Sequence, residues 1–169
     1  MTDNTQEATT LVLDRDTVLK TVGKRSFCTL ATVSAANRPH AAAVIYSLVD
    51  TTLYVNTGRN SRKARNIADN PNVGIVIPVR RVPLGAPPST LQFQAKAEIL
   101  PLDDPDLGEL HKAGLLKTIT RHGEMDDPAN CFLRITPNGR IHTYGLGMSL
   151  WQLARHPLDA FGHADLSSR

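Results

Sequence analysis

The sequence comprises 169 residues, of which 41% are hydrophobic and 21% charged, and its formal net charge is +3 with an isoelectric point near 9.1. This length suits one well-filled domain rather than two, and the composition is that of a globular protein rather than a disordered chain. Outside one stretch the basic residues are scattered among acidic ones, so charge alone does not indicate a nucleic-acid-binding protein.

Several common functional classes have no support in the sequence. Cys28 and Cys131 lie far apart in apolar runs without a Cys-x-x-Cys pattern, which favours buried free thiols over a disulfide or a zinc site. The motifs Gly-x-Ser-x-Gly, His-Glu-x-x-His, Walker A and Gly-x-Gly-x-x-Gly are absent, so typical hydrolases, zinc proteases, nucleoside triphosphatases and dinucleotide folds are not indicated. No apolar run approaches the length of a membrane span, and the polar, acidic N-terminus is unlike a secretory signal, so we expect a cytoplasmic protein without a membrane partner.

The N-terminal third predicts a helix followed by three antiparallel strands. Residues 1–10 are polar and aperiodic and are expected to form a flexible tail. Asp14 or Asp16 can cap a short helix that ends at Gly23. β-Branched and apolar residues then favour strands, separated by turn residues, over 26–34, 40–49 and 52–56.

The next stretch, Asn56–Asn70, is the strongest candidate for a ligand site. A strand leads into a turn at Gly58, and Asn60 or Ser61 can cap the helix that follows. The start of this helix carries four basic side chains: Arg59, Arg62, Lys63 and Arg65. A helix N-terminus has unpaired backbone N–H groups and a partial positive charge, so together with these cations it suits a phosphate group. The alternative is a solvated basic helix end on an ordinary strand-to-helix connection.

The second half of the chain predicts further strands and two helices. Residues 73–79 form an apolar run typical of a buried strand, residues 80–88 contain three prolines and are expected to be a loop, and residues 90–100 alternate as a one-sided strand does. Helix starts are predicted near Asp103–Asp106 and at Ser149, and a hairpin is predicted where Pro137–Gly139 separates the strands 131–136 and 140–144. The predicted fold is therefore mainly β (α+β). We expect a six- to seven-stranded antiparallel barrel with peripheral helices over 11–156 and a C-terminal tail over 157–169.

No fixed acid–base pair is evident, and isolated polar residues on strands have structural explanations. His40 and His142 lie beside predicted strands, where a lone histidine is usually a hydrogen-bonded structural residue. Tyr46 and Ser47 could contact a ring system, although a tyrosine on a strand is more often half-buried packing. A chain without such a pair can be an enzyme when a cofactor carries the difficult step.

Three groups of residues in a fixed order carry a family resemblance. The first group is Thr29–Thr32 with Arg38-Pro39-His40. The second comprises Ser61-Arg62-Lys63, Arg65-Asn66-Ile67 and then Asn70-Pro71-Asn72-Val73, and the third is Phe93–Ile99. In this combination the chain resembles the pyridoxamine 5'-phosphate oxidase-like split-barrel superfamily over roughly residues 26–144. Within that superfamily it is most similar to the flavin/deazaflavin-dependent oxidoreductase branch.

The resemblance implies a Greek-key split barrel that forms a homodimer and holds a flavin-type cofactor in grooves at the subunit interface. Arg62 and Lys63 match positions that grip the cofactor phosphate. Ser61, Arg65 and Asn66 are their neighbours. The positions that match the ring or ribityl surroundings are Asn56, Thr57, Tyr46, Ser47, Ser89 and Thr90.

The chain also departs from true pyridoxamine 5'-phosphate oxidases. Ala41 and Tyr46 stand where those oxidases have an arginine and a lysine, and their C-terminal substrate-binding motif is not visible in residues 139–169. The resemblance therefore does not extend to vitamin-B6 oxidation. The Lys-x-Arg-Asn form of residues 63–66 slightly favours coenzyme F-420, a deazaflavin, while the Ser-Arg-Lys form is shared with FMN binders, so FMN is the alternative.

We therefore expect an oxidoreductase that transfers a hydride between a reduced deazaflavin or flavin and a small organic acceptor, without a nucleophilic side chain or a bound metal. The second interpretation is a non-catalytic protein that stores or senses FMN, deazaflavin or haem. A third, a nucleic-acid-binding protein, is disfavoured because no aromatic residues are interleaved with the basic ones.

Overall fold

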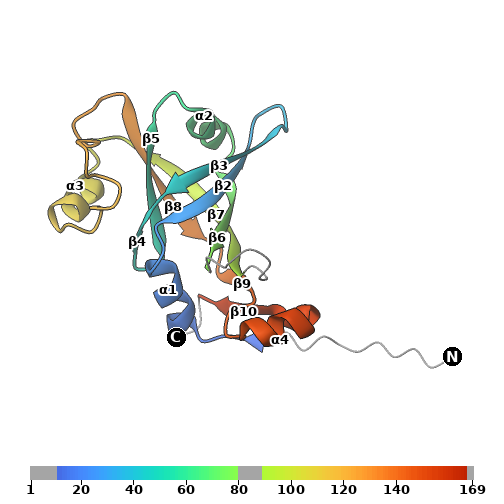
Figure 1. Ribbon diagram of the computed structural model, residues 1–169. Coiled ribbons are helices and arrows are strands. Elements are labelled where there is room, and N and C mark those ends of the chain that lie inside the picture. The colour runs from blue at the N-terminus through green and yellow to red at the C-terminus, as the bar shows by residue number, and fades with distance from the viewer. Residues whose placement is uncertain (1–10, 80–88, 167–169) are drawn as a thin grey trace.

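The computed structural model describes residues 11–79 and 89–166, which form a strongly curved sheet with helices at its periphery (Figure 1). In chain order the elements are β1 (Leu11–Val12), α1 (Arg15–Gly23), β2 (Phe27–Val33), β3 (Pro39–Ile45), β4 (Ser47–Val49), β5 (Thr52–Gly58), α2 (Arg62–Asp69), β6 (Asn72–Pro78), β7 (Thr90–Leu100), α3 (Pro105–Lys112), β8 (Asn130–Pro137), β9 (Arg140–Tyr144), α4 (Leu150–Arg155), the 3₁₀ helix η1 (Pro157–Ala160) and β10 (Phe161–Asp165). The predicted mainly β barrel with peripheral helices is confirmed.

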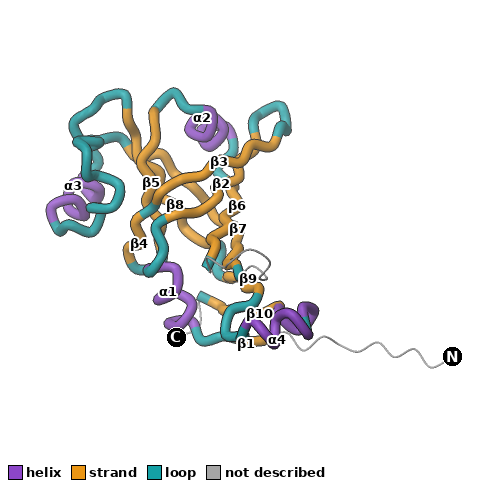
Figure 2. Tube along the Cα trace, viewed as in Figure 1, coloured by secondary structure: helices purple, strands orange, loops and turns teal. Residues whose placement is uncertain are grey.

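The strands of the described residues belong to one ten-stranded sheet, drawn in orange in Figure 2. One path through it runs β1-β10-β9-β7-β6-β2-β3, and a second branch continues from β7 through β8 and β5 to β4. β3 and β5 approach each other without forming a ladder, so the barrel is split between them. This opening lies beside the strand that leads into α2.

The predicted hairpin at Pro137–Gly139 is wrong. β8 and β9 both pair with β7, with the C-terminal part of β7 against β8 and its N-terminal part against β9. Between them, Asn138 N donates to Gln94 O at 2.9 Å, and Gly139 has a φ of +90°. Because β7 has eleven residues, it is long enough to pair with both strands in succession, and the segment between them is a bulge rather than a turn.

The strand predicted over 40–49 is interrupted. β3 pairs with β2 whereas β4 pairs with β5, and Tyr46 lies at this change of partner. The Tyr46 side chain is fully buried, and its hydroxyl donates to the carbonyl oxygen of Val22 at 2.8 Å. The run around Tyr46 contains no glycine, proline or other turn signal, so its pattern did not reveal the break.

Residues 157–169 were predicted to be a tail, but within them the structure has η1 and β10. β10 pairs antiparallel with β9 and parallel with β1. This strand is rich in small and polar residues rather than β-branched ones, so the sequence did not predict it. β1, β10 and the split of 40–49 account for ten strands instead of six or seven. The predicted tail at 1–10 and loop at 80–88 lie outside the described residues.

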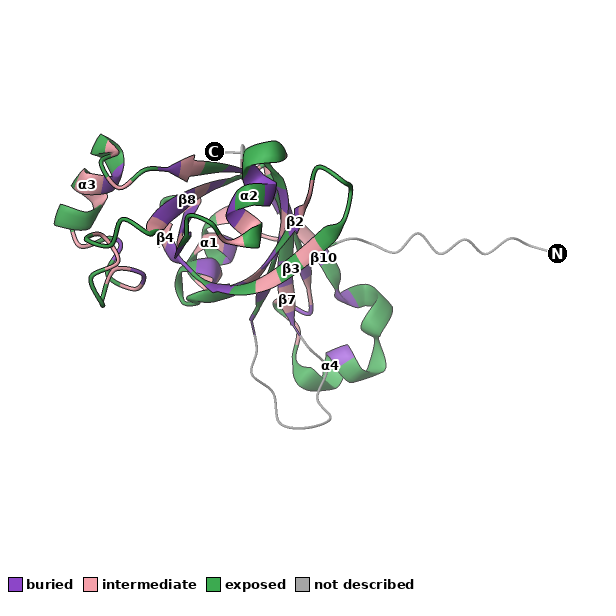
Figure 3. Cartoon of the chain, turned by 90° about the horizontal axis from the view of Figure 1, so that it is seen from above, coloured by how far each residue is buried: buried purple, intermediate pink, exposed green. Residues whose placement is uncertain are grey.

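Two clusters of buried side chains form the core, and Figure 3 shows the buried positions along the strands and on the inner side of α2. The larger cluster fills the barrel and includes Val18 and Val22 of α1. The smaller one lies around Leu107 of α3 and Phe132 of β8. Both cysteines are buried and free, as predicted. Within the described ranges no helix has the length and apolarity needed to cross a membrane.

Candidate functional site

The start of α2 has the predicted strand-turn-helix geometry. After β5, Ser61 N donates to Gly58 O at 2.9 Å, which closes the turn. Ser61, rather than Asn60, is the N-cap, because its Oγ accepts the N–H of Ala64 at 3.3 Å. Thr57 Oγ1 lies 3.2 Å from Ser61 Oγ and joins the end of β5 to this cap. The cap therefore holds the helix start against the strand.

The basic side chains at this helix start have no ion-pair partner among the described residues. The first turn of α2 contains no acidic residue. Arg62 and Arg65 are exposed, whereas Lys63 is partly buried. Burial raises the pKa of the Cys131 thiol, and the nearby charges of Arg59 and Lys63 oppose this rise, which places both cations near the start of β8. The start of α2 thus gathers positive charges that form no ion pair with the described residues.

A groove of about 310 Å³ opens beside these cations. We call it the α2 groove, and it is lined by Ala43, Val44 and Ile45 of β3, Asn56 of β5, Lys63 of α2, and Thr118, Ile119, His122 and Glu124. Asn56 Nδ2 is buried and has no hydrogen-bond partner in the described part of the chain. An unmatched buried donor next to an ammonium group fits a ligand that brings an acceptor atom as well as an anion.

The wall formed by Thr118–Glu124 was not predicted. It follows α3 in a segment without regular periodicity, so no pattern in the sequence placed it beside β3. His122 N donates to Glu124 Oε2 at 2.8 Å, and this hydrogen bond holds the pKa of Glu124 below its usual value. Glu124 O accepts from Asn130 Nδ2 at 3.4 Å. The second of these bonds attaches the wall to the start of β8.

Two predicted site residues have structural contacts instead of facing the α2 groove. Asn66 is buried on the inner side of α2, and its Nδ2 donates to Thr32 Oγ1 of β2 at 2.9 Å. Tyr46 belongs to the core and bonds Val22. Ser47 is buried, and its Oγ has no partner among the described residues. Of the predicted ring-contacting positions, Asn56 is the one that lines the groove.

Ser89 and Thr90 lie far from the groove within one chain. Thr90 is the first residue of β7, whereas Leu100 at its other end pairs with Phe132, which in turn pairs with Asn56. Ten residues of extended chain span roughly 30 Å. A single chain therefore does not bring Thr90 to the ligand side of Asn56.

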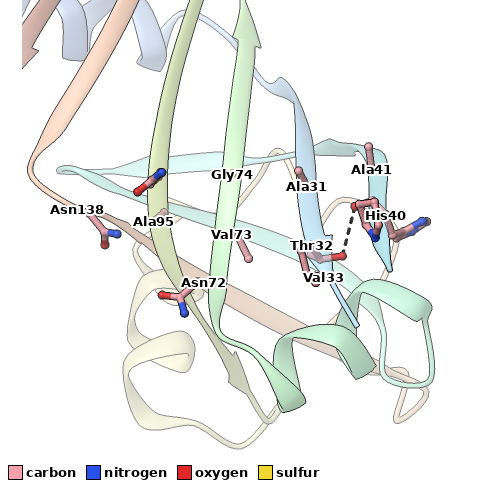
Figure 4. Close-up of a pocket in the computed structure, with 12 residues that line it drawn as sticks. Ala31, Thr32, Val33, His40, Ala41, Asn72, Val73, Gly74, Ala95 and Asn138 are labelled. Carbon is pink, nitrogen blue, oxygen red and sulfur yellow. Dashed lines mark hydrogen bonds between the residues drawn. The ribbon is translucent and has the colours of Figure 1, made fainter. Parts of the chain in front are cut away.

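Larger concavities lie elsewhere on the sheet (Figure 4). One of about 600 Å³ is formed by β2, β3, β6 and β7, with the small residues Ala31, Ala41 and Gly74 among its lining. It adjoins a second of about 660 Å³ that reaches Arg140, His142 and Phe161. We call the two together the sheet-face concavity. The α2 groove is smaller, but it contains Lys63 and adjoins the helix start that carries Arg59, Arg62 and Arg65, so charge rather than volume makes it the candidate anion site.

Comparisons with known proteins agree with this architecture. Residues 15–143 match the family described as Pyridoxamine 5'-phosphate oxidase. No curated protein matches the chain.

Solved structures share the fold at low identity. The chain is similar to the haem-storage protein HutZ from Vibrio cholerae, with 22% identity over 73% of this chain and 89% of that one and a TM-score of 0.59. It is also similar to a putative pyridoxamine 5'-phosphate oxidase from Listeria innocua (22% identity, 73% and 92% covered, TM-score 0.58). A third is a FAD-binding protein from Mesorhizobium loti (18% identity, 75% and 89% covered, TM-score 0.58). Since the family match spans most of the sequence and the fold agrees, this chain belongs to the pyridoxamine 5'-phosphate oxidase family of split-barrel proteins.

Proposed function

We propose that the α2 groove binds a phosphorylated flavin-type cofactor and that the protein is an oxidoreductase acting on a small organic acceptor. The observation that carries this proposal is the uncompensated positive charge at the start of α2, next to a groove that contains the unpartnered donor Asn56 Nδ2. Membership of a family that includes oxidases supports the cofactor class.

Each residue of the groove has a part that follows from its chemistry. Lys63 and Arg62 neutralise the phosphate, and the first N–H groups of α2, which helix geometry leaves without intrahelical partners, donate to its oxygens. Asn56 Nδ2 would donate to an acceptor atom of the cofactor, and Ala43 and Ile45 would offer it an apolar contact. When bound, the cofactor supplies the hydride, so the chain itself needs only to bind and orient the reactants.

Between the two cofactors we retain the preference for coenzyme F-420, with FMN as the alternative. Of the Lys-x-Arg-Asn form, Lys63 and Arg65 carry this preference. Asn66 does not contribute, because its Nδ2 donates to Thr32 Oγ1. An absorbance spectrum and the mass of the ligand released from protein expressed in its own host distinguish the two. A protein that releases neither, and that binds neither when they are added, would contradict the proposal.

We also propose that two copies of the chain associate through the sheet-face concavity. Phe27, Val76 and Phe161 are large apolar side chains exposed on β2, β6 and β10. Ser89 and Thr90 can reach an α2 groove only from a second copy, since within one chain they lie at the end of β7 opposite to Leu100, whose neighbour Phe132 pairs with Asn56, and β7 is roughly 30 Å long.

The self-association is tested at Ala31, an exposed residue that lines both parts of the concavity. Replacing Ala31 with arginine is expected to give a folded monomer by light scattering and circular dichroism. An unchanged dimer, or a monomeric wild-type protein, contradicts this interface.

A second candidate function is haem binding without catalysis. His142 and Phe161 line the sheet-face concavity, where the imidazole would ligate a haem iron and the aromatic ring would contact the porphyrin, while the neighbouring Arg140 is ion-paired with Asp165. The similar protein from Vibrio cholerae is named as a haem-storage protein. Titration with haem distinguishes the two functions. A Soret shift that is present in wild-type protein and absent in His142→Ala would favour haem binding. Binding of a flavin-type cofactor is instead expected to depend on Lys63.

A further inference from the structure

The α2 groove contains more ionisable chemistry than phosphate anchoring requires. Three of its lining residues are ionisable: Lys63 from α2, and His122 and Glu124 from the opposite wall. The groove residues from β3 and β5 are apolar or neutral amide side chains. Lys63 has a role in the proposed function, but His122 and Glu124 do not.

The wall that carries His122 is fixed to the core rather than loosely attached. Leu116 and Ile119 are buried in the smaller core cluster, with Ile119 N donating to Leu116 O at 2.9 Å. Thr120 Oγ1 donates to the same carbonyl at 3.0 Å. On the other side, the backbone N–H of His122 is held by Glu124. His122 therefore lines the groove from a segment that is attached to the smaller core cluster through Leu116 and Ile119.

The charge state of His122 decides the net charge of the groove lining. Lys63 carries a positive charge, and Glu124 carries a negative charge because the N–H of His122 stabilises its ionised form. Within the lining itself these two charges offset each other, so a protonated His122 adds a positive charge to those that Arg59 and Arg62 supply at the α2 start outside the lining. Histidine is the side chain that makes this change near neutral pH.

We propose that His122 is a second anion-binding residue of the α2 groove, and that its protonation strengthens binding of the phosphorylated ligand. This inference rests on the proposed function, since it requires that the groove receives an anionic cofactor. Binding then favours the protonated imidazole, so the complex takes up protons and the affinity is higher at mildly acidic pH than at mildly alkaline pH.

The test is calorimetric titration of the full-length protein with FMN and with coenzyme F-420 at about pH 6 and about pH 8. The measured quantity is the affinity ratio between wild-type protein and His122→Gln at each pH, because the ligand's own phosphate ionisation cancels in this ratio. Glutamine keeps a hydrogen-bond donor and the backbone N–H that Glu124 accepts. His111→Gln, at an exposed site on α3, is the matched control.

We expect wild-type protein to bind about three- to fivefold more tightly than His122→Gln at the lower pH and equally at the higher pH, as for a partly exposed charge contact. Glu124→Gln is expected to bind more tightly than wild type at both pH values. Proton uptake, measured in buffers of different ionisation enthalpy, should disappear in His122→Gln and persist in His111→Gln. An affinity ratio that does not change with pH overturns the role of His122 while leaving the cofactor site intact, whereas no binding of either cofactor by the wild-type protein refutes the proposed function.

Discussion

Replacing Arg62 and Lys63 together with alanine is expected to change ligand affinity and fold stability in opposite directions. Neither side chain has an ion-pair partner among the described residues, and both lie at the positive end of the α2 dipole. Removing each unfavourable charge stabilises the ligand-free protein by about 0.5 kcal/mol, or about 1 kcal/mol for the pair. For a chain of this size that corresponds to a rise in Tm of about 2–4 °C.

The same change removes the charge-assisted contacts to the ligand phosphate. Each such contact contributes about 1.5–3 kcal/mol when fully buried, and Arg62 is exposed, so we expect a loss of about 2–3 kcal/mol for the pair. This corresponds to a roughly 30- to 150-fold weaker Kd. Fluorescence titration with the flavin-type ligand gives the affinity, and calorimetric melting of the ligand-free protein gives the stability.

A charge-matched control separates these effects from net charge. Lys20→Ala with Lys24→Ala removes the same two charges from the C-terminal end of α1, where cations are favourable. This control should keep its affinity and lose a little stability. If the Arg62/Lys63 variant instead melts lower than wild type, the two side chains support the fold, and if its affinity is unchanged the phosphate site is wrongly placed.

The remaining predictions concern the fold that positions the site. Asn66→Ala should lower the free energy of unfolding by about 1–3 kcal/mol in urea, because it leaves the buried Thr32 hydroxyl without its donor; an unchanged midpoint would mean that the bond is dispensable. Gly162→Ala should destabilise the folded protein by about 1–3 kcal/mol, because an added Cβ would lie 2.7 Å from a backbone oxygen. Gly108→Ala in α3 is the control: its added Cβ meets no atom within 4 Å, so it should stabilise the protein. Equal effects of the two substitutions would contradict the packing. Asp14 caps α1, and its hydrogen bond with the Thr17 N–H lowers its pKa from the usual 3.8, so its stabilisation is present above pH 3.8 and is lost as the pH falls through the lowered value. The stability difference between wild type and Asp14→Ala should therefore shrink in acid, and a constant difference would assign the effect to something other than the carboxylate.

The sequence predicted elements whose signal is local. The alternation along β7 and the cap at Ser61 depend on neighbouring residues only, and both have their counterparts in the structure. The pairing of β8 with β9 was predicted wrongly because a turn-like Pro-Asn-Gly sequence does not reveal that a third strand is long enough to pair with both. Strand β10 was missed because its pairing with β9 and β1, rather than its composition, stabilises it.

For the candidate site, too, the sequence predicted the local elements and not the tertiary contacts. Lys63 and Asn56 belong to one continuous strand-turn-helix unit, and both line the α2 groove. Tyr46 and Asn66 are in the right part of the chain, but their hydrogen bonds are with Val22 and Thr32. The direction in which these two side chains point depends on tertiary contacts, which cannot be inferred from a single sequence. The His122 wall comes from an aperiodic segment and became visible only in three dimensions.

The bulge at 138–139 determines which residues of the C-terminal strands face solvent. In β9, Ile141 and Thr143 are buried while His142 is exposed. The number of residues in the bulge sets which of these positions face the core. Deleting one residue there would shift the register by one and exchange the two sides, placing an imidazole inside the barrel and an isoleucine in water. The length of this short connection is therefore constrained by the burial pattern of β9.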